Sequence, residues 1–135
     1  MITIKNIKFN INDGKAVLSA KLYRNNSAVS DIFIRTDKKY IDFIRKDATP
    51  FIPIAFIVAS KLNEELVITD QASPAILANL DKIGPILSRW NVGFKTIQVT
   101  APNKNSLPRL SKQTASFFTA GVDSFYTYLK HKDEQ

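Results

Sequence analysis

The first third of the chain alternates apolar and polar positions, a period of two that is typical of β-strands with one buried face. One alternating run occupies positions 7–11, and a second occupies positions 16–22. Between the two runs lies Asn12-Asp13-Gly14, a sequence typical of the tight turn that joins antiparallel strands. The pattern therefore predicts a β-hairpin in this part of the chain.

The same alternation extends the hairpin at both ends. Ile2 and Ile4 are out of phase with the first run, which indicates a β-bulge near positions 5–6. After a loop at 24–27, a further strand is expected over 29–35. We therefore expect three short antiparallel strands at the front of the chain.

The period changes from that of strands to that of helices in the next segment. Asp37 is expected to cap a short helix over 38–46. Thr49 followed by Pro50 is typical of an N-cap with proline in the first helical position. The stretch 50–62 is apolar nearly all round, so we expect a helix that is buried on every side.

A strand, a helix and a second strand follow. Strands are expected over 66–69 and 94–100, and Ser73 before a proline again marks a helix start. Gly84 and Pro85 interrupt this helix, so we expect a kink or a break there. The order predicts a parallel βαβ crossover. Apolar residues at helical spacing form its core-facing stripe: Ile76, Leu77, Leu80, Ile83, Leu87 and Trp90.

These elements predict an α/β fold in which antiparallel strands precede a βαβ unit. Residues 1–100 are expected to form an accessory N-terminal α/β domain. Residues 101–114 contain two prolines, two asparagines and few large apolar side chains, which is typical of a linker. Residues 115–135 are expected to hold the first strand, loop and helix of another domain.

The charge of the chain is strongly basic. Lysine and arginine number 19 against 12 acidic residues, and ten basic and five acidic residues lie within 1–50. A basic balance favours an anionic partner, and aromatic residues at 23, 33 and 40 are interleaved with the charges. Two interpretations stay open for this region: a basic module that binds RNA or another anion without catalysis, and a solvated sheet face.

Composition excludes several other classes of protein. Cysteine is absent and histidine occurs once, at His131, which excludes a disulfide framework, a thiolate nucleophile and a cysteine zinc site. The longest apolar stretch has 13 residues, whereas a membrane-spanning helix needs about 20. Residues 1–11 lack the apolar core of a secretory signal. We therefore expect a cytoplasmic protein without a membrane partner.

Small and polar residues follow a short apolar run near the end of the chain. A strand is expected over 115–118, and the helical spacing of Phe125, Tyr126 and Leu129 predicts a helix. A tight turn at a helix N-terminus presents unpaired N–H groups and a partial positive charge to an anion. The segment 119–124 is therefore a candidate phosphate-binding loop. Its residues are Thr119, Ala120, Gly121, Val122, Asp123 and Ser124.

This segment resembles the PP-loop of the N-type ATP pyrophosphatase superfamily, also called adenine nucleotide alpha-hydrolase-like, whose signature is Ser-Gly-Gly-x-Asp-Ser after a first strand. Gly121, Asp123 and Ser124 match the signature, and Thr119 keeps the hydroxyl. Ala120 departs from glycine, at a cost of about 1 kcal/mol if the backbone there needs a positive φ. The wider stretch 73–130 is similar to bacterial PP-loop proteins that carry an extra N-terminal domain.

The resemblance implies binding of ATP and Mg²⁺, cleavage of ATP between its α and β phosphates, and adenylation of a substrate oxygen. It implies that Thr119 and Ser124 donate their hydroxyls to pyrophosphate. It also implies that Ala120, Gly121 and Val122 donate backbone N–H groups. Asp123 is implied to bind Mg²⁺ or to hold the loop, because its negative charge would repel a phosphate.

The resemblance also changes what the length of the chain leads us to expect. Only 11 residues follow Ser124, whereas a PP-loop domain needs several more strands and helices. We therefore expect this chain to be the N-terminal portion of such a protein and to be inactive alone. The strand over 115–118 is expected to pair with the preceding sheet or with a second copy of the chain, which would give a homo-oligomer.

Overall fold

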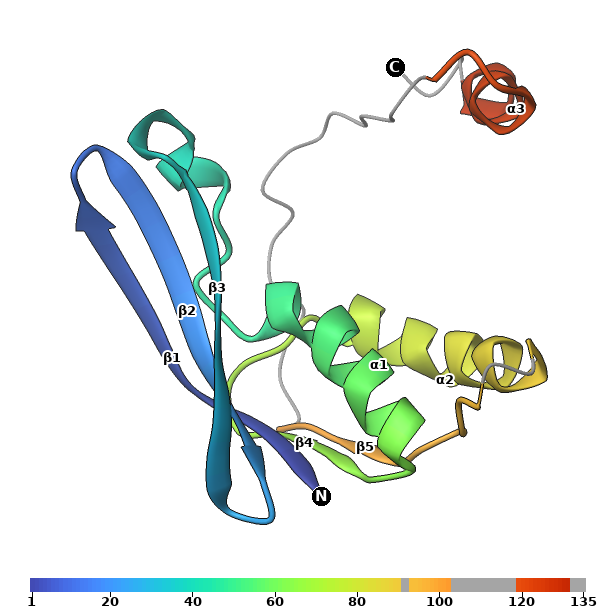
Figure 1. The fold of residues 1–135 in the computed structure, drawn as a ribbon. Helices are drawn as coiled ribbons and strands as arrows, with labels where there is room; N and C mark the ends of the chain where they lie inside the picture. Colours follow the sequence, from blue (N-terminus) through green and yellow to red (C-terminus); the bar gives the residue numbers. More distant parts are fainter. Residues whose placement is uncertain (91–92, 103–118, 132–135) are drawn as a thin grey trace.

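A computed structural model describes residues 1–90, 93–102 and 119–131, which form an α/β fold around one five-stranded sheet (Figure 1). The strand order in the sheet is β3-β2-β1-β4-β5. Along the chain the elements are β1 (Ile2–Asn12), β2 (Lys15–Arg24), β3 (Ser27–Asp37), the 3₁₀ helices η1 (Lys38–Phe43) and η2 (Thr49–Phe51), α1 (Ile52–Leu62), β4 (Leu66–Ile68), α2 (Pro74–Arg89), β5 (Val99–Thr100) and α3 (Val122–His131).

The three antiparallel strands predicted at the front are confirmed, and so are the turns between them, but the strands are longer than expected, at 11, 10 and 11 residues. Asp13 and Gly14 have φ angles of 48° and 71°, and Asn25 and Asn26 have φ angles of 49° and 68°. Two consecutive left-handed residues form the turn whose twist matches that of a hairpin, and asparagine, aspartate and glycine tolerate that conformation best. These residue types therefore fix where β1 turns into β2 and β2 into β3.

The predicted bulge in β1 is also confirmed. The pairing of β1 with β2 shifts register between Lys5 and Lys8. Asn6, inside this shift, has a φ of 62° and donates its side-chain amide to the Tyr23 hydroxyl at 3.0 Å. The extra residue returns the apolar side chains that follow it to the core face, which explains why the two apolar runs of β1 are out of phase.

The hydrophobic core lies between one face of the sheet and the helices α1 and α2. Figure 1 shows both helices on the same side of the sheet. Leu18 and Ile4 from the sheet pack in one cluster with Phe51 and Ile52 from the start of α1 and with Leu80 from α2. The opposite face of the strands carries no helix within the described part of the chain (Figure 1).

The predicted βαβ crossover is present, with one difference in its helix. Strands β4 and β5 are parallel, with Leu66 opposite Val99. Helix α2 between them does not break at Gly84-Pro85 but continues to Arg89. Gly84 is buried against α1, and a Cβ placed there would lie 3.6 Å from the Phe56 ring. Packing on both sides of the proline therefore keeps the helix continuous despite the missing N–H donor.

Two predicted helix starts differ from the structure because the side chains have other partners. Asp37 does not cap its helix, which is 3₁₀ in form, but makes an ion pair with Lys15 across the hairpin. The Thr49 hydroxyl accepts the N–H of Ser73 at 2.9 Å instead of capping a helix. The buried Asp47 carboxylate accepts the Thr49 N–H at 2.8 Å, so it provides an acceptor for the first N–H of η2.

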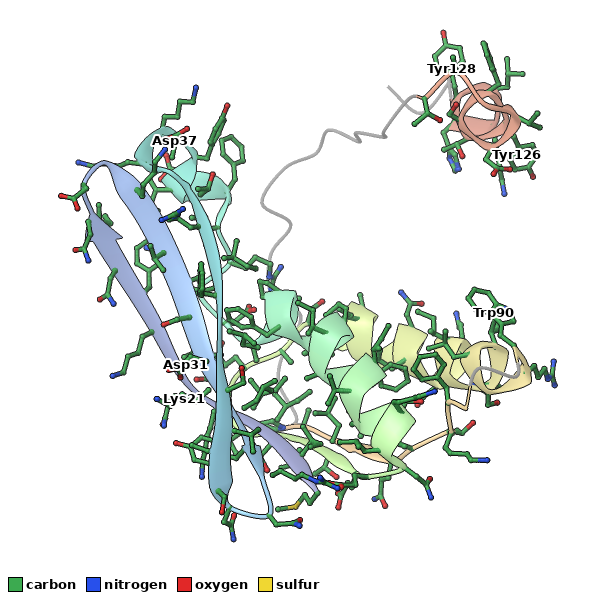
Figure 2. The ribbon with its side chains drawn as sticks, in the orientation of Figure 1. Lys21, Asp31, Asp37, Trp90, Tyr126 and Tyr128 are labelled. Carbon is green, nitrogen blue, oxygen red and sulfur yellow. The ribbon has the colours of Figure 1, made fainter. Side chains whose placement is uncertain are left out.

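The expectation that helix 50–62 is buried on every side is wrong. One face of α1 packs on the sheet, whereas several large apolar side chains on its other faces are exposed: Ile54, Ile57, Val58 and Leu62. Two members of the predicted stripe of α2 are exposed as well: Ile83, and Trp90, which Figure 2 labels at the end of α2. The last strand is also shorter than the predicted 94–100, because only Val99 and Thr100 pair with β4.

An ion cluster joins the start of β1 to the end of α1. The N-terminal ammonium and Arg24 lie 2.7 Å and 2.6 Å from the two carboxylate oxygens of Glu64. The hydrogen bond from the ammonium, followed by that from Arg24, holds the pKa of the Glu64 carboxyl below its usual value. One of the basic residues of the front segment is therefore neutralised by an acid from the middle of the chain.

Candidate functional site

The segment 119–124 contains a turn and the first residues of helix α3, which begins at Val122. The first backbone bond of this helix runs from the Phe125 N–H to the Gly121 carbonyl at 3.1 Å. The N–H groups of Val122, Asp123 and Ser124 precede that bond, so the helix itself supplies no acceptor for them. This end of α3 therefore presents three backbone donors together with the positive end of the helix dipole.

Ala120 adopts the backbone conformation that the glycine of the PP-loop signature would favour. Its φ is 60°, in the left-handed region. A Cβ in this region is strained by about 1 kcal/mol or more. Residue 120 thus takes this conformation without being glycine, and the strain of its Cβ lowers the stability of the turn.

The two hydroxyls of the loop differ in what they can offer to a ligand. Ser124 is 9% exposed, and its Oγ donates to the Gly121 carbonyl at 2.8 Å. Its hydrogen is therefore committed to the loop in this structure. Thr119 is exposed, and its Oγ1 lies 3.6 Å from the position that a Cβ on Gly121 would take. Because Gly121 has no such atom, the space beside the Thr119 hydroxyl stays open.

Asp123 lies exposed in the first turn of α3. A carboxylate at this end of a helix interacts favourably with the dipole. Mg²⁺ in nucleotide sites is usually held by one or two carboxylates together with phosphate oxygens. No cluster of three or more carboxylates or imidazoles capable of holding a metal occurs among the described residues. Asp123 is the acidic residue in the first turn of α3.

The surroundings of the loop are described only on its C-terminal side. The helix predicted there is present as α3, and its aromatic residues are exposed, with Tyr126 and Tyr128 visible in Figure 2. The predicted strand 115–118 lies outside the described residues, and so does nearly all of the predicted linker. The pairing expected for that strand stays a prediction.

A second candidate site is the face of β1, β2 and β3 that points away from the core, called the outer face below. Residues directly opposite each other in antiparallel strands project to the same side. Lys8, Ser19 and Phe33 form one such row across the three strands. The next row contains Arg35, and rows on either side contain further lysines. The basic residues of the outer face are Lys5, Lys8, Lys15, Lys21 and Arg35.

Ion pairs neutralise part of this outer face. Lys21 pairs with Asp31 at 2.9 Å, as Figure 2 shows, and Lys15 pairs with Asp37. The hydrogen bond and the charge of Asp31 raise the pKa of Lys21 above its usual value. Exposed pairs of this kind contribute little to stability. Because Lys15 and Lys21 are paired, the positive charge of the outer face that has no acidic partner among the described residues lies on its other basic residues.

The basic and aromatic residues of this region could be identified from the sequence, but which of them share a face could not. The structure separates them: Tyr40 and its two neighbouring lysines lie on η1, beyond the end of β3. The turn at Asp13-Gly14 is the sequence feature from which the residues of the outer face could have been predicted. It places Asn12 opposite Lys15, and a period of two from there assigns the side chains of the hairpin to a face as far as the bulge between Lys5 and Lys8, where the phase changes.

Within the described ranges, no helix is both long enough and apolar enough to cross a membrane. Searches against protein-family models, curated proteins and solved structures found no significant match to this chain.

Proposed function

We propose that the chain is the N-terminal portion of a PP-loop nucleotide-binding protein and that segment 119–124 holds the phosphates of ATP. The observation that carries the proposal is the left-handed Ala120, two residues before the start of α3. A left-handed residue followed by helical ones turns successive N–H groups toward one point, which suits an anion. The Thr119 hydroxyl lies at the edge of the same turn.

Each residue of the loop has a distinct part in the proposal. The backbone N–H groups at the start of α3 and those of residues 120–122 bind phosphate oxygens, and the Thr119 hydroxyl donates a further bond. Ser124 holds the turn closed through the Gly121 carbonyl. Asp123 holds Mg²⁺ jointly with the bound phosphates. The family chemistry, ATP cleavage between the α and β phosphates with adenylation of a substrate, is proposed for the protein to which this portion belongs.

The alternative function is a basic module that binds RNA or another anion without catalysis. It draws its support from a different observation, the charge of the outer face, and needs nothing from segment 119–124. The two functions are compatible, because β1 to β3 and α3 are separate elements.

Thr119→Ala is expected to weaken the binding of ATP with Mg²⁺ about tenfold, because it removes one hydrogen bond to a charged group. Isothermal titration of the full chain measures the affinity. Thr127→Ala is the matched control, since the Thr127 hydroxyl donates to the Asp123 carbonyl at 2.9 Å within α3. Equal losses in both variants would show that the helix and not the loop is responsible, and undetectable binding by the unmodified chain would overturn the proposal.

A further inference from the structure

We propose that the outer face binds single-stranded nucleic acid, independently of the proposed nucleotide site. No helix that packs on the sheet among the described residues covers this face, because α1 and α2 both lie on the opposite side of the sheet (Figure 1). Its three long strands, of 11, 10 and 11 residues, give an extended surface. The surface combines unneutralised cations, an exposed aromatic ring and small polar side chains.

The cations at the centre of the face are Lys8 and Arg35. Neither makes an ion pair with any residue that the structure describes, in contrast to Lys15 and Lys21. Lys8 is on β1 and Arg35 is on β3, in adjacent rows. Strands two apart are separated by about 10 Å. Two charges at this spacing can contact different phosphates of one strand rather than a single small anion.

The aromatic ring of the face is that of Phe33, which is 65% exposed. It lies in the row of Lys8, and Arg35 is two residues further along the same side of β3. Most of this large apolar ring is therefore available to a ligand within the described part of the fold. Bases stack on such rings with little dependence on sequence. Tyr23 offers less, because Lys5 lies over its ring at 3.9 Å and Asn6 bonds its hydroxyl.

The combination favours a single strand over the other anionic polymers. A duplex keeps its bases stacked inside, so it would contact the cations but could not use the Phe33 ring. The carboxylates of an acidic peptide would pair with Lys8 and Arg35, but acidic side chains have no aromatic ring to stack on Phe33. Unpaired bases can lie on the ring while the phosphates reach the cations on either side. Ser19, Asn10 and Asn12 add hydrogen-bonding groups to the same face.

Fluorescence anisotropy with labelled 12-nucleotide oligo-uridine and oligo-thymidine tests the proposal on the full chain over a range of salt concentrations. Log affinity is expected to fall linearly with log salt. The double variant Lys8→Gln/Arg35→Gln should reduce the steepness of that line by about 1.4, or about 0.7 for each phosphate contact removed. Phe33→Ala should weaken binding about tenfold and leave the slope unchanged, because stacking releases no counterions.

The matched control is Lys82→Gln/Arg89→Gln, which removes the same charge from exposed positions on α2. It is expected to leave the slope nearly unchanged. Equal effects of the two double variants would overturn the proposal, as would a Phe33→Ala variant that binds like the unmodified chain. Binding of a 12-base-pair duplex as tightly as the single strand would also overturn it. No ATP is present in this assay, so its failure leaves the proposed ATP site unaffected.

Discussion

Phe51→Ala is expected to lower the free energy of unfolding by about 3–5 kcal/mol. Phe51 is 1% exposed and lies at the junction of η2 and α1, where it packs in the cluster that joins the sheet to both helices. Truncation removes most of a buried ring and leaves a cavity that the surrounding strands cannot fill. Urea unfolding followed by far-UV circular dichroism measures the loss.

Phe43→Ala is the control for this prediction, because Phe43 is 66% exposed at the end of η1. Its expected effect is within about 0.5 kcal/mol, as for most surface changes. Phe51→Leu keeps more of the buried volume and should fall between the two. Similar losses for Phe51→Ala and Phe43→Ala would show that the core does not lie where the structure places it.

Ala120→Pro is expected to weaken ATP binding at least about tenfold, whereas Ala120→Gly should tighten it. Proline holds φ near −65°, which is incompatible with the observed 60°. Glycine adopts that conformation without the strain of a Cβ, which is about 1 kcal/mol. Relief of this strain raises the population of loops ready to bind, which corresponds to about fivefold in affinity. Isothermal titration with ATP and Mg²⁺ compares the two variants with the unmodified chain.

Circular dichroism of both variants serves as the check on folding. Residue 120 precedes α3, so neither change removes a backbone bond of that helix. Helix content is therefore expected to stay constant while the affinities move in opposite directions. Unchanged affinity in the proline variant would mean that phosphate binding, where it occurs, does not use the left-handed turn.

The antiparallel part of the fold could be predicted in detail because its signals are local. Asp13 and Gly14, and later Asn25 and Asn26, carry the left-handed turns that their residue types favour. The phase change after Ile4 marked the bulge that the register shift confirms. The parallel crossover β4-α2-β5 followed from the order of the elements.

The errors arose where a residue's partner is distant in the sequence. Thr49 was expected to cap a helix but accepts the N–H of Ser73, and Asp37 pairs with Lys15 on the neighbouring strand. Helix α2 continues through Pro85 because Gly84 packs against Phe56 of another helix. Periodicity gives the apolar faces of a helix, but whether a second element covers each face depends on tertiary packing. The exposure of Ile57 on α1 could therefore not be read from the sequence.

The candidate loop could be located from its sequence, but its conformation could not. The order of small residues and hydroxyls predicted a turn followed by a helix, and the helix is present as α3, although it begins at Val122, within the segment expected to form the turn. That Ala120 takes the left-handed conformation is information from the structure. The commitment of the Ser124 hydroxyl to the Gly121 carbonyl likewise depends on that turn, and it moves the proposed donor role to Thr119.

Amide chemical-shift mapping tests the proposed ATP site most directly. The ¹⁵N-labelled full chain is titrated with inorganic pyrophosphate and then with ATP, each with Mg²⁺, and every backbone N–H is followed by nuclear magnetic resonance. The account predicts that both ligands shift the amides of residues 120–124 most strongly, with the largest changes at the start of α3. Shifts confined to the outer face of β1 to β3, or no shifts at all, would contradict it.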